Sequence, residues 1–196
     1  MNVHATPIGW PALAVFFGGL LLFGAMLLLV GKRAPEGDEG GRSRRSIIGI
    51  VIQMLAFFAV GAGRLDVELQ PASPPALAEA AIVLALTVIT CGLFFASKRA
   101  LGRNWSLVAR TRSDHELVTW GPFAYVRHPI YSALFFWLLG MAVAFGHYRG
   151  LILGVPLYWI GTGLRITEEE KLLKAQFGPA YDAYAVRVKR FAPGLF

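Results

Sequence analysis

Long apolar runs separated by basic segments constrain this chain more than any other feature. The first run covers residues 8–30, and no lysine, arginine, aspartate or glutamate occurs before residue 32. As a helix, a run of this length can cross a bilayer core of about 30 Å. A cleavable signal peptide would have a basic start and a shorter apolar core, so we expect this segment to remain as a membrane span.

Four more apolar runs follow, at residues 47–63, 76–97, 130–146 and 151–164. The last two are short for full crossings, and residues 146–150 between them are typical of a tight turn, which predicts a helical hairpin. Hydrophobic residues make up 56% of the 196-residue chain and charged residues only 16%, whereas about a quarter of a soluble domain is charged. The sequence therefore predicts an all-α integral membrane protein with five transmembrane helices.

The basic residues predict the orientation of these spans. Seventeen of the 19 lysines and arginines lie between spans one and two, between spans three and four, or after span five; the other two are Arg64 and Arg149. Because basic residues are enriched on the cytoplasmic side, the N-terminus is expected outside and the C-terminus inside. The net charge of +7 then follows mostly from topology, and we expect no nucleic-acid partner.

Several kinds of site are excluded by the motifs that the sequence lacks. Cys91 is the single cysteine, so a disulfide framework is not expected. The four histidines show no metal-binding spacing, and there is neither a P-loop nor a G-x-G-x-x-G after a strand. We therefore expect no metal site.

The first candidate functional segment connects the third and fourth runs. Residues 98–128 form a connection of about thirty residues, longer than most loops and typical of a functional one. Pro129 predicts a helix start, with His128 extended before it, and the backbone N–H groups there could hold a carboxylate or phosphate. Alternatively, Arg127 and His128 anchor the span at the membrane interface, with Tyr125 and Tyr131 in the aromatic belt.

The second candidate segment follows the fifth run, where three acidic residues oppose the positive-inside trend. Thr167 and Glu170 fit a capping box at a helix start, and Glu170 with Lys174 fits an i,i+4 pair, so Glu170 has a structural explanation. Glu169 is explained less well, since it shares a helix face with Arg165 near the membrane surface. Further on, an apolar stripe at helical spacing predicts a packed helix, and its members are Phe177, Tyr181, Tyr184 and Val188.

With these two segments, the chain resembles the isoprenylcysteine carboxyl methyltransferase family, within the wider group of membrane methyltransferases that includes phospholipid N-methyltransferases. The matching blocks are L-G-R-N-W-S at residues 101–106, H-E-L-V and R-H-P-I-Y within residues 115–131, and E-E-E followed by F-G, two tyrosines and a proline within residues 168–193. The R-H-P-x-Y block followed by an E-E pair after one apolar hairpin is the specific signal. The apolar runs predict three N-terminal transmembrane helices within residues 1–97, and the resemblance implies a methyltransferase core at residues 98–196.

The resemblance also implies an S-adenosylmethionine site on the cytoplasmic side, closed by a C-terminal helix. The residues it implies for cofactor binding are His115, Glu116, Leu117, Val118, Phe123, His128, Pro129, Ile130, Tyr131 and Glu169. Arg165 occupies the place of the family's substrate-contacting arginine, and it is a candidate catalytic residue together with His128. Phe123 departs from the tyrosine usual in the family, so a hydroxyl contact is lost or relocated while ring stacking remains available.

The resemblance implies methyl transfer to a lipophilic carboxylate, such as a prenylated cysteine, that enters from the bilayer. A carboxylate is ionised at neutral pH and needs no general base, and Arg165 would orient it through a charge-assisted hydrogen bond. A lipid amine would need a base, for which His128 and Glu169 are candidates. Two further alternatives are an NADPH-dependent protein related to sterol reductases, which are usually much longer, and a non-catalytic membrane module. The expected partners are a lipophilic or lipidated substrate and membrane lipids.

Overall fold

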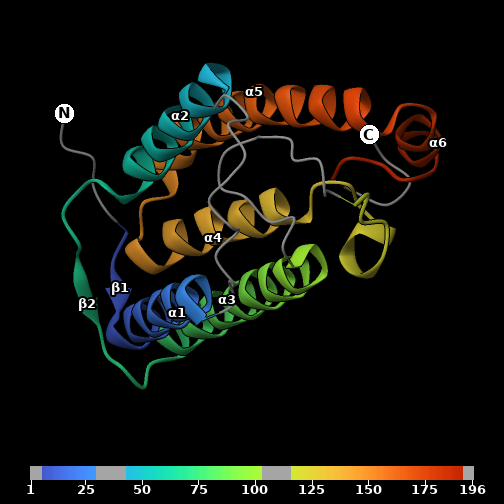
Figure 1. The fold of residues 1–196 in the computed structure, drawn as a ribbon. Helices are drawn as coiled ribbons and strands as arrows, with labels where there is room; N and C mark the ends of the chain where they lie inside the picture. The colour runs from blue at the N-terminus through green and yellow to red at the C-terminus, as the bar shows by residue number, and fades with distance from the viewer. Residues whose placement is uncertain (1–5, 30–42, 103–115, 192–196) are drawn as a thin grey trace.

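The computed structural model describes residues 6–29, 43–102 and 116–191, and these are mostly helical (Figure 1). The helices are α1 (Trp10–Leu29), α2 (Arg44–Gly61), α3 (Pro74–Leu101), α4 (Pro129–Phe145), α5 (Leu151–Phe177) and α6 (Pro179–Arg187). Short 3-10 turns at Gly121–Ala124 and Tyr148–Gly150 precede α4 and α5. The prediction of a helical chain is confirmed, with one exception: β1 (Ile8–Gly9) and β2 (Val67–Leu69) pair as short parallel strands.

Proline and glycine mark the helix boundaries. Proline occupies the first position of α3, α4 and α6, where its missing N–H costs no helical hydrogen bond. The helix start predicted at Pro129 is therefore confirmed, but His128 is not extended, since its ψ is 56°. Tertiary contacts hold this residue instead, since its backbone N–H donates to the carbonyl of Arg190 at 3.0 Å and its ring Nε2 lies 3.1 Å from Glu170. Gly146 ends α4 with φ of 66° in the turn predicted at residues 146–150.

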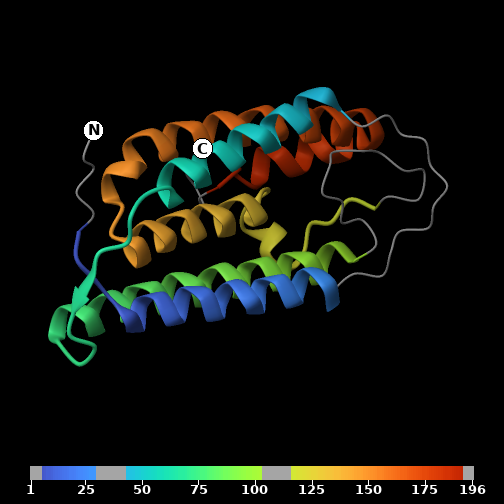
Figure 2. The ribbon, with the colours of Figure 1, turned by 90° about the vertical axis from the view of Figure 1, so that its left-hand side faces the viewer.

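Helix α4 lies between two helix pairs (Figures 1 and 2). On one side of it α2 packs along α5, and on the other side α1 packs along α3. Trp137 and Leu138 of α4 share one apolar core with Phe16 of α1 and Tyr158 of α5. The Tyr158 hydroxyl also donates to the backbone carbonyl of Tyr131 at 2.5 Å, which joins α5 to the first turn of α4.

The connections between helices gather at two opposite ends of the bundle. At the end that we call the far end, the backbone N–H of Thr6 donates to Gly146, and that of Ile8 donates to Asp66. The imidazole of His147 also lies within hydrogen-bond distance of the carbonyl of Val60 there. The other end, which we call the site end, contains the start of α4, the last turns of α5 and helix α6 (Figure 2). The long helices thus alternate in direction.

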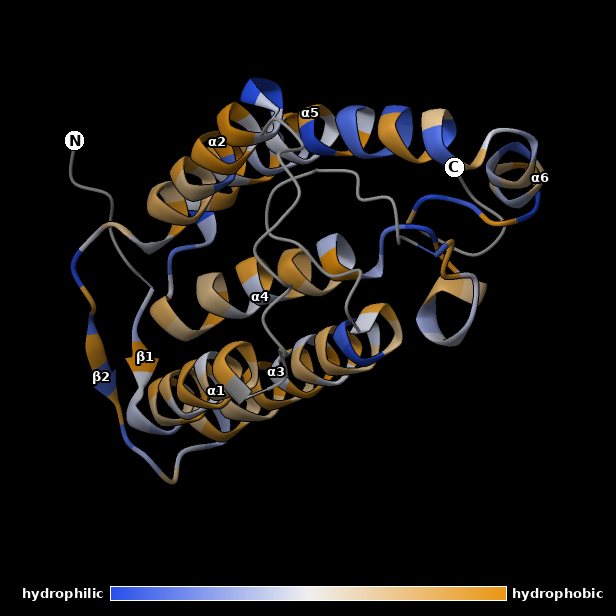
Figure 3. Ribbon diagram, in the orientation of Figure 1, coloured by the Kyte–Doolittle hydropathy of each residue, from blue (hydrophilic) through white to orange (hydrophobic). Residues whose placement is uncertain are grey.

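Four of the helices are long and apolar enough to cross a membrane, and α4 is a shorter apolar helix of 17 residues. Large apolar side chains such as Leu28 and Phe58 are exposed on them, at 83% and 70%, which is typical of helices that face lipid. Figure 3 shows that hydrophobic residues make up most of these helices. The expectation that the fifth run is short is wrong. Helix α5 continues through the acidic residues to Phe177, because neither glycine nor proline interrupts the chain between Leu164 and Gly178.

Glycine allows α2 and α5 to approach closely. A Cβ atom on Gly49 would lie 2.6 Å from Cγ of Arg165 and 2.7 Å from the carbonyl oxygen of Gly161. Small residues at such contacts are typical of membrane helix pairs.

We expect Gly49→Ala to lower the free energy of unfolding by about 1–3 kcal/mol, because α2 and α5 must move apart. Gly163→Ala on α5 is the control, since nothing lies within 4 Å of its Cβ position. That control should be neutral or stabilising, because alanine is the better helix former. Thermal unfolding of both variants in detergent tests this, and equal stability would refute the close contact.

Candidate active site

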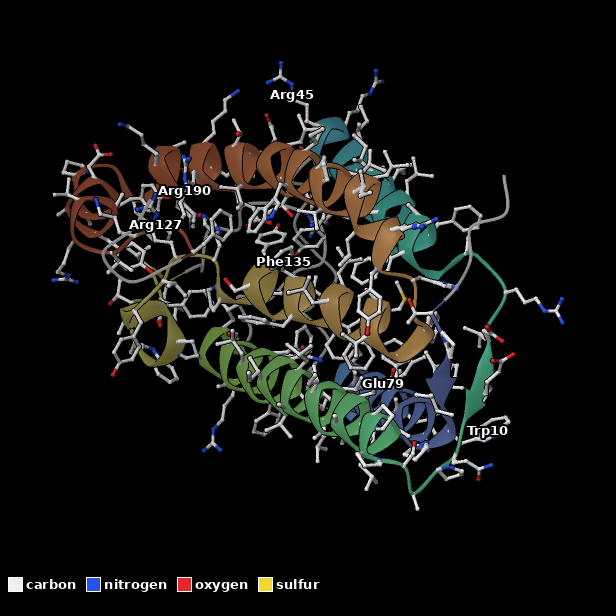
Figure 4. The ribbon with its side chains drawn as sticks, turned by 180° about the vertical axis from the view of Figure 1, so that it is seen from behind. Trp10, Arg45, Glu79, Arg127, Phe135 and Arg190 are labelled. Atoms are coloured by element: carbon white, nitrogen blue, oxygen red, sulfur yellow. The ribbon has the colours of Figure 1, made fainter. Side chains whose placement is uncertain are left out.

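The C-terminal tail is attached to the segment that precedes α4. The backbone N–H of Arg127 donates to the carbonyl of Lys189 at 2.8 Å, and that of His128 donates to Arg190 at 3.0 Å. The guanidinium of Arg127 also donates to the carbonyls of Ala185 and Val188 at the end of α6. Arg127 and Arg190 accordingly lie near each other at the site end (Figure 4). Arg127 is therefore a structural link to the tail and not simply an interfacial anchor.

Glu170 joins this attachment to α5. Its Oε1 lies 3.0 Å from Nη2 of Arg127 and 3.1 Å from Nε2 of His128. Arg190 donates to the same carboxylate from Nε, at 3.0 Å, and from Nη2. We call these residues (Arg127, His128, Glu170 and Arg190) the Glu170 cluster. It connects the start of α4, the helix α5 and the tail through one carboxylate.

The structural explanation proposed for Glu170 from sequence is wrong. Thr167 and Glu170 lie inside α5, so no helix starts there and no capping box forms. The Thr167 hydroxyl instead donates to the carbonyl of Gly163 at 2.8 Å. Lys174 pairs with Asp182 of α6 at 3.0 Å. Glu170 and Lys174 thus have partners on other elements in place of each other, while Thr167 bonds within its own helix.

Glu169 faces a different group of side chains. Its Oε1 accepts a short hydrogen bond from the hydroxyl of Tyr131, and its Oε2 lies 3.7 Å from Nδ1 of His128. Tyr131 is 4% exposed, so the alternative that placed it in an aromatic belt is wrong. His128 stands between the two carboxylates, with one ring nitrogen toward each.

Arg165 lies deeper in the bundle, where it is 8% exposed. Its Nη1 donates to Oε1 of Gln53 on α2 at 2.8 Å. Its Cζ atom lies 5.0 Å from the ring centroid of Tyr131, a distance typical of a cation–π contact. Tyr131 therefore contacts Arg165 through its ring and Glu169 through its hydroxyl, which brings a buried cation and a carboxylate to the start of α4.

A pocket lies beside these groups at the site end. It contains about 500 Å³ of empty space, counting the solvent at its mouth. Most of its lining is apolar or aromatic, and its residues are Leu101, Glu116, Leu117, Val118, Phe123, Arg127, His128, Leu173, Tyr181 and Tyr184. Such a lining suits a flat ring system with a few polar substituents.

The tail contributes two neutral phenols to this pocket. Burial raises the pKa of Tyr184 to about 12, and it raises the pKa of Tyr181 above its usual range, with the Glu170 charge adding to the effect. The Tyr184 hydroxyl donates to the carbonyl of Phe123 at 2.7 Å. The Tyr181 hydroxyl is buried and has no hydrogen-bond partner among the residues that the structure describes. A ligand with a polar edge would satisfy that hydroxyl.

The candidate residues thus fall into two adjoining groups. Glu116, Leu117, Val118, Phe123 and His128 line the pocket. Tyr131, Glu169 and Arg165 form the polar group beside it, and Pro129 and Ile130 begin the helix between them. His115 lies outside the described residues, as do residues 103–106 of the first matching block.

The contributors that were missed as functional residues from sequence include Arg190, Gln53, Tyr181 and Tyr184. Arg190 and Tyr181 reach the site through the fold of the tail, which no local spacing predicts. Gln53 had a usable signal, because it is the one polar side chain in the apolar run at residues 47–63. A polar side chain within a membrane span is a functional hypothesis by default.

The fold and the site define an integral multi-pass membrane protein with a polar site at one end of its helices. Residues 81–175 match the sequence model of the isoprenylcysteine carboxyl methyltransferase (ICMT) family. The resemblance inferred from the sequence motifs is therefore confirmed over this part of the chain.

Individual relatives agree with this match. The chain is 39% identical over 94 residues to "Protein-S-isoprenylcysteine O-methyltransferase" of Schizosaccharomyces pombe, covering 47% of this chain and 40% of that protein. It is 31% identical over 114 residues to "Nickel-cobalt-cadmium resistance protein NccN" of Alcaligenes xylosoxydans xylosoxydans, covering 57% of this chain and 53% of that protein. The matches thus span about half or less of these relatives' lengths.

The fold is also similar to a solved structure, the eukaryotic intramembrane Ras methyltransferase ICMT. The TM-score is 0.62 at 22% sequence identity, over 94% of this chain and 68% of that one. At this identity the similarity establishes the membrane fold, and it extends to the N-terminal helices that the family model does not cover.

Proposed function

We propose that the protein spans the membrane five times, with the N-terminus outside and the site end on the cytoplasmic side. The alternation of the helices supports five crossings, with α4 as the short fifth one between two helix pairs. The distribution of charge supports the orientation. Arg45, Arg127 and Arg190 lie toward the site end (Figure 4). Arg64 and Arg149 instead lie in the connections between α2 and β2 and between α4 and α5, at the far end.

Cysteine labelling of intact cells tests this topology. We expect cysteines at positions 64 and 148 to react with an impermeant reagent from outside, and those at positions 45 and 174 to react only after permeabilisation. The native Cys91 is buried and should give a low background. Labelling of position 174 from outside would contradict the topology, and it would also contradict a cytoplasmic cofactor site.

We propose that the pocket binds S-adenosylmethionine. The apolar and aromatic lining suits an adenine ring, and the Tyr181 hydroxyl, which no described residue bonds, suits a polar group on the same ligand. Glu169 would accept hydrogen bonds from amino or hydroxyl groups, while the backbone N–H groups at the start of α4 would hold a carboxylate. The bound sulfonium would supply the methyl group in a one-step in-line displacement.

We propose that the methyl acceptor is a lipophilic carboxylate, such as a prenylated cysteine, entering from the bilayer. The observation that carries this proposal is Arg165, a buried guanidinium 5.0 Å above the Tyr131 ring and next to the group formed by Tyr131 and Glu169. A guanidinium attracts an anion and repels an ammonium group, so it favours a carboxylate over a lipid amine.

The protein's own residues have a limited chemical task in this reaction. An ionised carboxylate needs no general base, so Arg165 orients the acceptor, and neither His128 nor Glu169 must remove a proton. Positioning and exclusion of water then provide most of the rate acceleration. The tail helix α6, which supplies Tyr181 and Tyr184 to the pocket wall, excludes water from that side.

The test is a methyl-transfer assay with labelled S-adenosylmethionine on the purified protein in lipid nanodiscs. We expect transfer to prenylated cysteine or fatty carboxylates and none to aminophospholipids. Transfer to the amines alone would contradict the carboxylate proposal. Binding of NADPH in place of S-adenosylhomocysteine, measured by calorimetry, would contradict the cofactor proposal.

A further inference from the structure

Gln53 joins Arg165 to the rest of the bundle from a different helix. It is 3% exposed on the face of α2 that packs against α5. Its Oε1 accepts from Nη1 of Arg165 at 2.8 Å, and its Nε2 donates to the hydroxyl of Thr162 at 2.7 Å. Both ends of the amide thus contact α5, one turn apart.

These two contacts allow one orientation of the amide. A guanidinium only donates hydrogen bonds, so it must face the carbonyl end of Gln53. The NH₂ end then faces Thr162, whose hydroxyl oxygen accepts. Thr162 therefore holds Gln53, and Gln53 in turn holds the guanidinium.

The helix contact leaves the stem of Arg165 little freedom as well. A Cβ atom on Gly49 would lie 2.6 Å from Cγ of Arg165, and one on Gly161 would lie 2.9 Å from Cγ of Gln53. With Tyr131 on its other face, the guanidinium is held between α2 and α4. A cation fixed in this way keeps its position when an acceptor arrives, which reduces the entropy lost on binding.

We propose that Gln53 is a positioning residue that makes the acceptor site selective for anions, an inference that rests on the proposed function. A neutral amide orients the guanidinium and adds no negative charge beside it. A glutamate of the same shape would orient it equally well, but it would form an ion pair that competes with the acceptor carboxylate. Gln53 lies outside residues 81–175, so the family match does not assign it this role.

The test compares two ligands that differ in charge but hardly in shape. An S-prenylated cysteine derivative with a free carboxylate and its primary amide are titrated against the protein in nanodiscs without any cofactor. The wild type should prefer the carboxylate. In Gln53→Glu this preference should fall about tenfold or more, because the introduced carboxylate competes for the guanidinium of Arg165. The ligand carboxylate then loses a hydrogen bond to a charged group. In methyl transfer, the KM for the carboxylate should rise while the KM for the cofactor is unchanged.

Thr90→Val is the matched control. Thr90 is fully buried and its hydroxyl donates to the carbonyl of Ala133 at 3.1 Å, so this variant also loses a buried hydrogen bond between helices. It should leave the ratio of carboxylate to amide affinity unchanged. Gln53→Met, which removes both contacts of the amide, should weaken carboxylate binding without a gain in amide binding.

The outcomes separate this inference from the proposed function. If the wild type methylates the carboxylate but Gln53→Glu retains the full preference for it, the inference is overturned and the proposed function stands. If the wild type neither prefers the carboxylate nor methylates it, the proposed function fails for every variant, and the role of Gln53 fails with it.

Discussion

Replacing Glu170 with alanine is expected to release the tail from the bundle and to lower the free energy of unfolding by about 3 kcal/mol or more. The reason is that Arg127 and His128, at 11% and 5% side-chain exposure, would lose the carboxylate that both contact. Removing one partner of such a buried ionic group usually costs about 3–5 kcal/mol. Thermal unfolding in detergent and limited proteolysis after Phe177 measure the two effects.

Glu169→Ala is the matched comparison, because it removes the same side chain from the next position of the same helix. Glu169 contacts Tyr131 and His128 but neither of the arginines that hold the tail in the described structure. We therefore expect near-normal stability with loss of measurable S-adenosylhomocysteine binding by calorimetry. If both variants lost stability and binding to the same extent, the two acids would act as one structural cluster, and Glu169 would have no separate cofactor role.

The contrast between these two acids shows what the sequence could predict about the site. Apolar runs and the proline at position 129 predicted the helices well, because each depends on local properties of the chain. The role of Glu170 was predicted wrongly because that prediction also relied on local spacing alone. Its spacing from Thr167 and Lys174 offered a complete local explanation, whereas its actual partners are Arg127, His128 and Arg190.

Arg190 approaches Glu170 because the chain after α6 returns to the start of α4, where residues 189 and 190 pair with residues 126–128. Nothing in the hydrophobic period of the tail specifies that pairing. Glu169 and Arg165, in contrast, were predicted as functional residues because a charged group near the membrane is energetically costly and no local contact explained these two. Their positions beside Tyr131 agree with that argument.

Removing the guanidinium in Arg165→Ala is expected to reduce methyl transfer to a carboxylate at least about tenfold, as follows from the loss of a hydrogen bond to a charged group. Cofactor affinity should change little, because Arg165 contacts Gln53 and the ring of Tyr131, while the pocket is lined by other residues. Arg165→Lys should restore only part of the activity, since an ammonium group cannot reproduce the guanidinium fork that binds Gln53 and a carboxylate together.

The same two variants separate the carboxylate proposal from its alternatives. If Arg165 only stabilises the contact between α2 and α5, lysine should substitute well, and thermal stability should fall in parallel with activity in Arg165→Ala. If the acceptor were a lipid amine, the cation would repel it, so removing Arg165 should not impair transfer. Measuring cofactor affinity, thermal stability and transfer for both variants distinguishes these cases. Full transfer to a carboxylate by Arg165→Ala would exclude this arginine as the group that orients the acceptor.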